Sequence, residues 1–101
     1  MRVLVMFDLP VTESSDLRAY TQFRKALVKN GFIMMQESVY CKLALNFQSA
    51  VLIKQYIYKV KPPKGTVQLL IITEKQYSEI EYVVGNRFSD QTDTMERLLL
   101  F

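Results

Sequence analysis

The residue with the clearest potential for chemistry is Asp8, a carboxylate that directly follows an apolar run over residues 3–7. A short apolar run rich in β-branched residues predicts a strand that is buried on both faces of a sheet. Pro10 ends this strand, over residues 2–10, because proline has no backbone N–H to give to a neighbouring strand. Asp8 is therefore expected at the rim of the sheet, as the chemical centre of the protein. The alternative is that Asp8 only begins a turn, where aspartate close to proline is common.

The residue types that are missing limit this chemistry. The chain has no histidine, which removes the usual general base, and Cys41 is its one cysteine. A lone cysteine forms neither an internal disulfide nor a zinc site, so catalysis would rest on carboxylates, tyrosines, serines or a metal. No apolar run approaches the ~18 residues that cross a membrane, and residues at the start of the sequence do not show a basic region followed by a long apolar stretch. We expect a cytoplasmic protein that contacts no membrane.

The net charge of +3 is unevenly distributed along the chain. Residues 1–64 hold ten Lys or Arg against four acids, a balance of +6, whereas residues 65–101 hold three against six, a balance of −3. A basic body with an acidic C-terminal part favours a polyanionic partner for the body.

A first helix is predicted to end near Asn30, with Ser14 or Ser15 as its cap and Gly31 after its end. Its predicted apolar face comprises Leu17, Tyr20, Phe23, Leu27 and Val28. A polar row on the opposite face comprises Arg18, Gln22, Lys25 and Lys29, three of which are basic. This row is either a solvated surface or a phosphate-binding one. Arg24 falls inside the apolar arc, where an arginine either snorkels or points at an anion.

A second helix is predicted over residues 47–60, capped by Asn46 and ended by two prolines. Its predicted core residues are Ala50, Ile53, Ile57 and Val60. Lys54, Tyr58 and Lys61 form a separate row on this helix. Such a basic and aromatic stripe can follow phosphates, although an ordinary amphipathic surface gives the same pattern.

The remaining segments predict the fold class. Residues 32–36 and 38–43 are expected to form either a hairpin or one bulged strand. Residues 66–73 predict a second apolar strand, residues 74–77 a turn or short helical loop, and residues 80–84 a further short strand. The order is β-α-β-β-α-β plus an extra C-terminal strand, which is the ferredoxin-like α+β arrangement. We expect this domain over residues 1–85 and a linker with an apolar tail over residues 86–101.

The two apolar strands also predict an interface. Both are apolar at nearly every position, so the sheet face that the helices leave bare should be hydrophobic too. An exposed apolar face of several hundred Å² is seldom left to water. We therefore expect a homodimer that packs through this sheet face. The tail, residues 95–101, is expected to dock on the partner protomer or on another protein.

Four sequence features together resemble one known family. They are FDLP at 7–10, the pair Arg24-Lys25 with Gly31-Phe32, MMQESVY at 34–40, and PPKG followed by TEKQY between 62 and 77. Over residues 1–85 the chain is similar to a CRISPR-associated protein, the small second member of the universal adaptation pair. That protein partners the CRISPR integrase, which is the other protein on which the tail is expected to dock. The amino-acid sequence is most similar to those of members from type II systems.

The resemblance implies a ferredoxin-like homodimer that acts in spacer acquisition, bridges two integrase dimers and holds duplex DNA. Members of the family were named as metal-dependent endonucleases of RNA or of duplex DNA. The resemblance therefore implies Mg²⁺ as cofactor and Asp8 as both metal ligand and catalytic residue. The predicted nucleic-acid contacts are Arg18, Arg24 and Lys25 from the first helix, together with Lys54 from the stripe. Gln36 and Ser38 match the family motif and are expected to support the site.

One position departs from the family pattern. Many members carry a second acid just after the proline, where this chain has Val11, and the nearest other acids are Glu13 and Asp16. Mg²⁺ prefers several oxygen ligands, so a single carboxylate holds it poorly. Two Asp8 side chains, one from each protomer, could instead flank a metal at the two-fold axis. The alternative function is a toxin-type endoribonuclease with the same ferredoxin-like fold.

Overall fold

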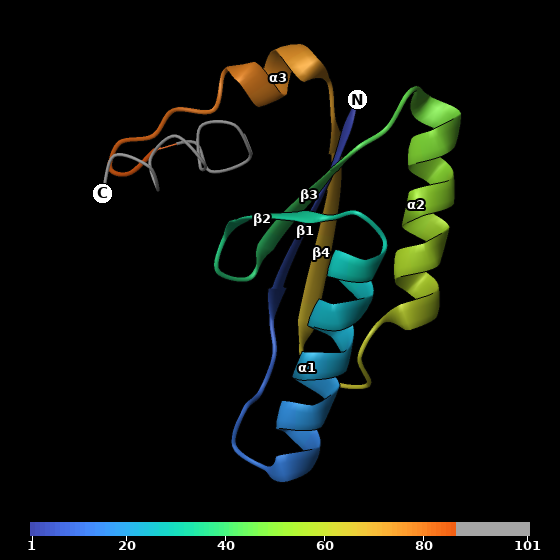
Figure 1. Ribbon diagram of the computed structural model, residues 1–101, viewed down its shortest axis with the longest axis vertical. Coiled ribbons are helices and arrows are strands. Elements are labelled where there is room, and N and C mark those ends of the chain that lie inside the picture. The colour runs from blue at the N-terminus through green and yellow to red at the C-terminus, as the bar shows by residue number, and fades with distance from the viewer. Residues whose placement is uncertain (87–101) are drawn as a thin grey trace.

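Residues 1–86, which the computed structural model describes, form a four-stranded antiparallel sheet with two long helices on one face (Figure 1). The elements in chain order are β1 (Arg2–Asp8), α1 (Ser14–Lys29), β2 (Ile33–Gln36), β3 (Val39–Leu43), α2 (Phe47–Val60), β4 (Thr66–Ile72) and α3 (Glu74–Ser78). The strand order β2-β3-β1-β4 confirms the predicted ferredoxin-like β-α-β-β-α-β arrangement. Because β1 lies between β3 and β4, Asp8 ends an inner strand of the sheet.

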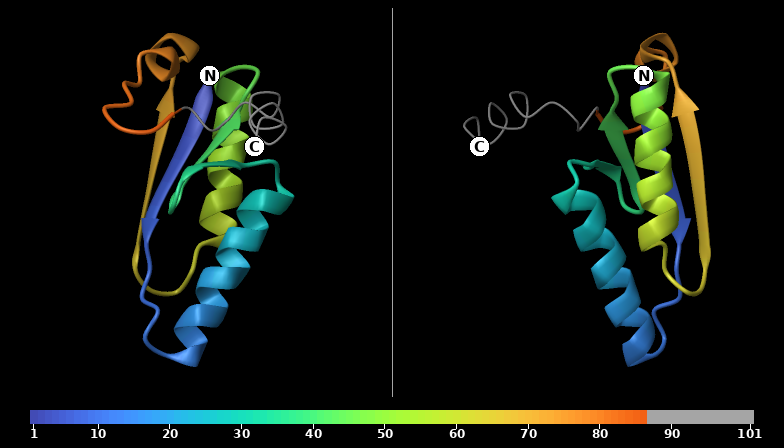
Figure 2. Two further views of the ribbon diagram at one scale, coloured as in Figure 1. Left: turned by 60° about the vertical axis from the view of Figure 1, so that its left-hand side comes forward. Right: turned by 90° about the vertical axis from the view of Figure 1, so that its right-hand side faces the viewer.

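The side chains of β1 alternate between the two faces of the sheet, as strand geometry requires. Val3, Val5 and Phe7 are buried in the core beneath α1 and α2, which lie on the same side of the sheet (Figure 2). The Phe7 ring packs with its centroid 5.2 Å from that of Phe23 and 5.8 Å from that of Tyr40. This aromatic packing fixes the end of β1, and therefore the backbone of the next residue, Asp8.

The second helix follows the sequence prediction closely. The Asn46 side chain accepts a hydrogen bond of 2.8 Å from the backbone N–H of Ser49, which confirms the predicted cap. Ala50 and Ile57 are fully buried against the sheet. Ile53 and Val60 are partly buried and pack on the same core, so the predicted apolar face is confirmed.

The first helix ends as predicted, with Asn30 as its C-cap and Gly31 after it at a φ of 89°, but it differs from the prediction at its N-terminus and in the width of its apolar face. Its N-cap is Glu13 rather than Ser14 or Ser15, and the Glu13 backbone N–H donates to the Asp16 carboxylate at 3.2 Å. Phe23 and Leu27 are buried as predicted, but Leu17 and Val28 are each about half exposed. The helix contacts the core along a narrower stripe than the predicted arc, so these outer apolar residues face water.

The segment from β2 to β3 combines the two alternatives that the sequence left open. The strands pair as an antiparallel hairpin, and their register shifts between Met34 and Gln36, which is a bulge or irregularity. The turn between them contains Ser38 with a φ of 64°, in the left-handed region. The turn is held against β1, because the Phe7 backbone N–H donates to the Ser38 carbonyl at 3.0 Å.

The sheet face opposite the long helices is partly covered by α3. Tyr77 and Ile80 pack there on a second cluster that includes Leu4, Cys41 and Ile72. α3 is also tied to the start of β1 by a charged contact. The Arg2 Nε donates to the Glu74 carboxylate at 2.9 Å, and the guanidinium lies 4.1 Å from the Tyr77 ring centroid. The sheet face that the two long helices leave uncovered is therefore less exposed than we expected from the sequence.

The predicted C-terminal strand over residues 80–84 is wrong, because residues 79–86 contain no strand. Ile80 is held by its packing on the second cluster instead, and a contact of this kind needs no strand pairing. Residues 87–101 lie outside the described part of the chain, and they include almost all of the predicted linker and tail. Within residues 1–86, no helix is both long enough and apolar enough to cross a lipid bilayer.

Candidate active site at the rim of the sheet

Asp8 is exposed at the end of β1, directly opposite Thr66 of β4. It lines an open hollow of about 230 Å³ on the sheet rim. The polar residues that line this hollow are Asp8, Glu37, Ser38, Thr66 and Gln68. The predicted rim position of Asp8 is therefore confirmed, and the residue is accompanied by other oxygen-bearing side chains.

The second carboxylate in the hollow, Glu37, is a residue that sequence reasoning missed. It belongs to the turn between β2 and β3, and the hydrogen bond from Phe7 to Ser38 places this turn beside the end of β1. Glu37 is 29 positions away from Asp8 along the chain, and its place within the run MQESVY carries no chemical signal of its own. Only the pairing of β1 with β3 brings the two carboxylates to one hollow.

Gly65 positions the backbone of Asp8 from the other side. Its φ is +90°, a conformation that side chains rarely adopt. A Cβ at this position would lie 2.8 Å from the Asp8 carbonyl oxygen and 2.8 Å from the Leu9 Cδ2 atom. Only glycine lets the connection between α2 and β4 approach the end of β1 this closely.

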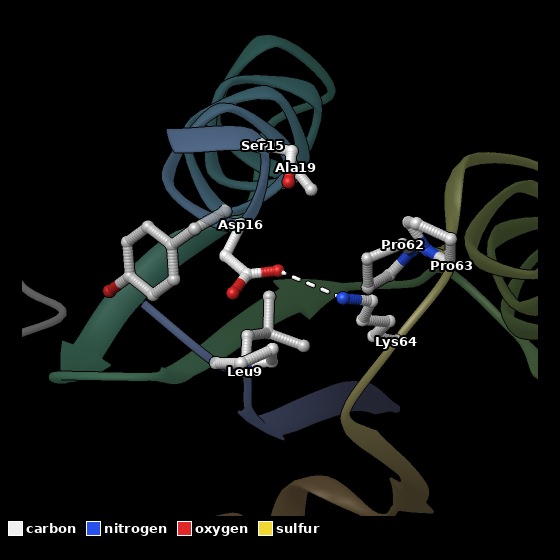
Figure 3. Close-up of a pocket in the computed structure, with 9 residues that line it drawn as sticks. Leu9, Ser15, Asp16, Ala19, Pro62, Pro63 and Lys64 are labelled. Atoms are coloured by element: carbon white, nitrogen blue, oxygen red, sulfur yellow. Dashed lines mark hydrogen bonds and ion pairs between the residues drawn. The ribbon is translucent and has the colours of Figure 1, made fainter. Parts of the chain in front are cut away.

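Asp16 has a structural role outside the hollow. Its side chain is 6% exposed and lines a separate small pocket of about 70 Å³ (Figure 3). One carboxylate oxygen accepts hydrogen bonds from the Thr12 hydroxyl and the Glu13 backbone N–H, both at 3.2 Å. The other lies 3.5 Å from the Lys64 Nζ atom. Asp16 thus ties the connection that follows β1 to the connection that precedes β4.

The environment of Asp16 keeps it charged. Burial raises the pKa of this carboxyl, but the Glu13 N–H, the positive charge of Lys64 and the Thr12 hydroxyl together lower the pKa below its ordinary value. Neither Asp16 nor the exposed Glu13 lines the hollow beside Asp8. Of the acids considered as second ligands from the sequence, the structure brings neither to the site.

The predicted nucleic-acid contacts fall on two different surfaces. Arg18 and Lys25 are exposed on α1. Arg24 is also exposed, and its Nε donates to the Tyr40 hydroxyl at 3.1 Å, which satisfies the polar end of a buried ring. Lys54 lines a groove between α2 and β4 instead. The structure therefore separates Lys54 from the basic residues of α1.

The two residues expected to support the site lie in or beside the turn between β2 and β3. Gln36 ends β2 at the register shift and is exposed. Ser38 lines the hollow, and its carbonyl accepts the hydrogen bond that fixes the turn to β1. Through this backbone contact Ser38 helps to place the end of β1, whereas the supporting role expected of Gln36 and Ser38 stays a prediction.

The donor set of the hollow fits one class of metal ion. No group of three or more His, Cys, Asp or Glu side chains that could hold a metal exists within residues 1–86. The hollow offers two carboxylates with hydroxyl and amide oxygens. Mg²⁺ is commonly held by one or two carboxylates, keeps several waters and takes further oxygens from substrate phosphates. The residues present therefore suit Mg²⁺ and do not form a closed structural zinc site.

Comparison with known proteins identifies the family. The family model described as CRISPR associated protein Cas2 matches residues 1–80. The chain belongs to the Cas2 family. A relative from Treponema denticola is 47% identical over 100 residues, 99% of each chain, and is named CRISPR-associated endoribonuclease Cas2. A relative of the same name from Lacticaseibacillus rhamnosus is 43% identical over 99% of each chain.

The resemblance stated from the sequence motifs is thereby confirmed, and the family assignment favours it over the toxin-type endoribonuclease. A crystal structure of Streptococcus pyogenes Cas2 at pH 6.5 matches with a TM-score of 0.61 and 19% identity. The match covers 84% of this chain and all of that one. At this level of identity the match supports the ferredoxin-like fold alone.

Proposed function

We propose that this protein acts in CRISPR spacer acquisition as a homodimer that binds duplex DNA and bridges integrase dimers. We further propose that it is a Mg²⁺-dependent endonuclease centred on Asp8. Membership of the Cas2 family supports the first role, together with the exposed basic residues of α1. The observation that supports the second role is the hollow that Asp8 shares with Glu37.

In the proposed reaction, Asp8 and Glu37 would hold Mg²⁺ through their carboxylates. Mg²⁺ bound there would neutralise charge on a phosphate and lower the pKa of a water molecule. Thr66 and Gln68 add a hydroxyl and an amide group that can donate hydrogen bonds to phosphate oxygens in the same hollow. A chain without histidine suits such a reaction, because the metal replaces imidazole as the source of activation. The relatives are named endoribonucleases, which specifies RNA as their substrate. For this protein we propose RNA or duplex DNA as the substrate, and the cleavage assay compares the two.

The surface beside the hollow supports the proposed dimer. α3 covers the sheet face around Leu4 and Ile72, whereas Leu70 remains 51% exposed and Met6 is half-buried. A second protomer packed on this uncovered part would exclude water from both apolar side chains. It would also bring its own Asp8 to the same interface, where the two Asp8 side chains would be available to one metal at the two-fold axis.

The proposed contact with duplex DNA uses the outer face of α1. Arg18, Lys25 and Lys29 are exposed and follow one another at helical spacing. Within residues 1–86, none of the three makes an ion pair with a carboxylate. Their charges are therefore available to phosphates, and binding of this kind releases counterions and weakens as salt is added.

Charge reversal on α1 tests this role. Arg18→Glu combined with Lys25→Glu is expected to weaken binding to a labelled duplex at least about tenfold and to reduce the slope of log affinity against log salt by about 2. Fluorescence anisotropy at several salt concentrations measures both quantities. Lys75→Glu on α3, away from this surface, is the control and should have little effect. Unchanged affinity and slope in the α1 variant at moderate salt would contradict the proposed binding surface.

A further inference from the structure

The segment that contains α2 and β4 is positively charged, because it has lysines and no acidic residue. From Ser38 to Thr73 the chain contains five lysines and neither aspartate nor glutamate. Two of these lysines have polar partners, since Lys42 donates to the Asn30 carbonyl and Lys64 pairs with Asp16. The other three are Lys54, Lys59 and Lys61, and within the described residues none of them pairs with a carboxylate.

Two of the three remaining lysines line a groove between α2 and the edge strand β4. The groove has a volume of about 250 Å³. Lys54, Tyr58 and Lys61 line it at helical spacing, and no acidic residue lines it. α2 stands between α1 and β4 in the right-hand view of Figure 2, so the groove opens on the side of α2 away from α1. It is thus separate from the basic surface of α1.

The groove combines two kinds of surface. Ile57 of α2 and Val67 and Leu69 of β4 form its apolar floor. Tyr58 is 62% exposed, and the Lys61 Nζ atom lies 5.8 Å from its ring centroid. Ammonium groups attract phosphate, whereas an aromatic ring over an apolar floor favours a flat ring such as a nucleobase. A phosphate alone would leave the floor unused, and an apolar peptide would leave the lysines unused.

We infer that this groove binds a nucleotide, with its phosphate held by Lys54 and Lys61 and its base placed against Tyr58 over the apolar floor. The nucleotide is either free or an unpaired unit of a nucleic-acid strand, because both present the same phosphate and base. This inference does not rest on the reaction proposed at Asp8.

The alternation of β4 separates the groove from the Asp8 hollow. Val67 and Leu69 face the helices and line the groove, whereas Thr66 and Gln68 line the hollow. Neighbouring residues of a strand point to opposite faces of the sheet, so the two sites lie on opposite faces of β4. A substitution in one of them can therefore be made without entering the other.

The test uses the full chain and three probes, which are adenosine 5′-monophosphate, adenosine and inorganic phosphate. NMR titration is expected to place the chemical-shift changes caused by the nucleotide on residues of the groove. Because base stacking on an aromatic ring adds to affinity, the nucleotide is expected to bind about tenfold more tightly than phosphate. Tyr58→Ala should remove this advantage and Tyr58→Phe should keep it. Equal affinity for nucleotide and phosphate would overturn the inference.

Charge variants complete the test. Lys54→Gln combined with Lys61→Gln is expected to weaken nucleotide binding at least about fivefold by loss of the phosphate contacts. Lys59→Gln is the control, because Lys59 is exposed on the same helix and does not line the groove. No change in the double variant would overturn the inference. Weaker nucleotide binding in Asp8→Asn would also overturn it, because the ligand would then belong to the other hollow.

A single-stranded hexanucleotide distinguishes the two sources of the nucleotide. If it binds more tightly than the mononucleotide and shifts the same groove residues, the natural ligand is an unpaired unit of a strand. If it binds no more tightly, the ligand is a free nucleotide. Binding of an acidic peptide at the groove with no response to either nucleotide probe would contradict the inference and assign the surface to a protein partner.

Discussion

Asp8→Asn is expected to lower metal-dependent cleavage at least about a hundredfold. Substitutions in the shell around metal ligands already cost 10–100-fold, and this change removes the charge of a ligand itself. Asp8 is exposed at a strand end, so the free energy of unfolding should change by no more than about 0.5 kcal/mol. Cleavage of labelled RNA and duplex DNA at a series of Mg²⁺ concentrations measures the effect. Full cleavage by the variant would contradict the proposed role of Asp8.

The same assay separates the two carboxylates and the two proposed roles. Glu37→Gln is expected to raise the Mg²⁺ concentration for half-maximal cleavage about tenfold, whereas Glu13→Gln should leave it unchanged. In cells, Asp8→Ala distinguishes bridging from cleavage. If spacers are still acquired while cleavage in vitro is lost, the biological role is bridging. If acquisition is lost while the dimer and duplex binding are intact, the nuclease reaction is part of that role.

Gly65→Ala is expected to have the largest effect on stability. Alanine adopts a positive φ only at a cost in free energy. The new Cβ would also lie 2.8 Å from the Asp8 carbonyl oxygen, so the backbone at Gly65 or Asp8 must move. We expect the free energy of unfolding to fall by about 2–5 kcal/mol from the two effects together. Urea denaturation at neutral pH measures the loss. Cleavage should fall as well, because the displaced backbone carries Asp8.

Gly31→Ala is the matched control for this prediction. Gly31 has a φ of +89°, but its added Cβ would meet only the flexible end of Lys42, at 3.6 Å. The free energy of unfolding should therefore fall only by the cost of a positive φ for alanine, about 1–2 kcal/mol. Cleavage should be unaffected. An equal loss of stability in the two variants would contradict the prediction, because the close approach of Gly65 to the Asp8 backbone would then add nothing to stability.

The fold could be predicted where the signal is local. The limits of α2, its Asn46 cap and its buried face follow from helical periodicity and capping chemistry, which act within a few residues. The order of strands and helices could also be predicted from local patterns, because each element has its own apolar periodicity and its own turn residues. The predicted strand over residues 80–84 failed because alternation in a short apolar segment does not show whether the segment pairs with a strand. Here Ile80 is partly buried by its packing on the second cluster.

The candidate site could be predicted only in part. The rim position of Asp8 could be predicted because a buried strand delivers its last residue to the edge of the sheet. Glu37 was missed because its place beside Asp8 depends on the pairing of β1 with β3 and on the bulged turn that follows β2. Asp16 was considered as a ligand because it is near Asp8 in sequence, yet its carboxylate is engaged by Thr12, Glu13 and Lys64. Distance along the chain was a poor guide to distance in the site.

The central claim is that Asp8 and Glu37 form one metal site, and Mn²⁺ binding followed by electron paramagnetic resonance tests it most directly. Mn²⁺ accepts the same oxygen ligands as Mg²⁺ and can be titrated without substrate. Relative to the unsubstituted protein, affinity should fall at least about a hundredfold in Asp8→Asn and about tenfold in Glu37→Gln, and it should be unchanged in Glu13→Gln. Equal Mn²⁺ affinity in all four proteins would contradict the claim.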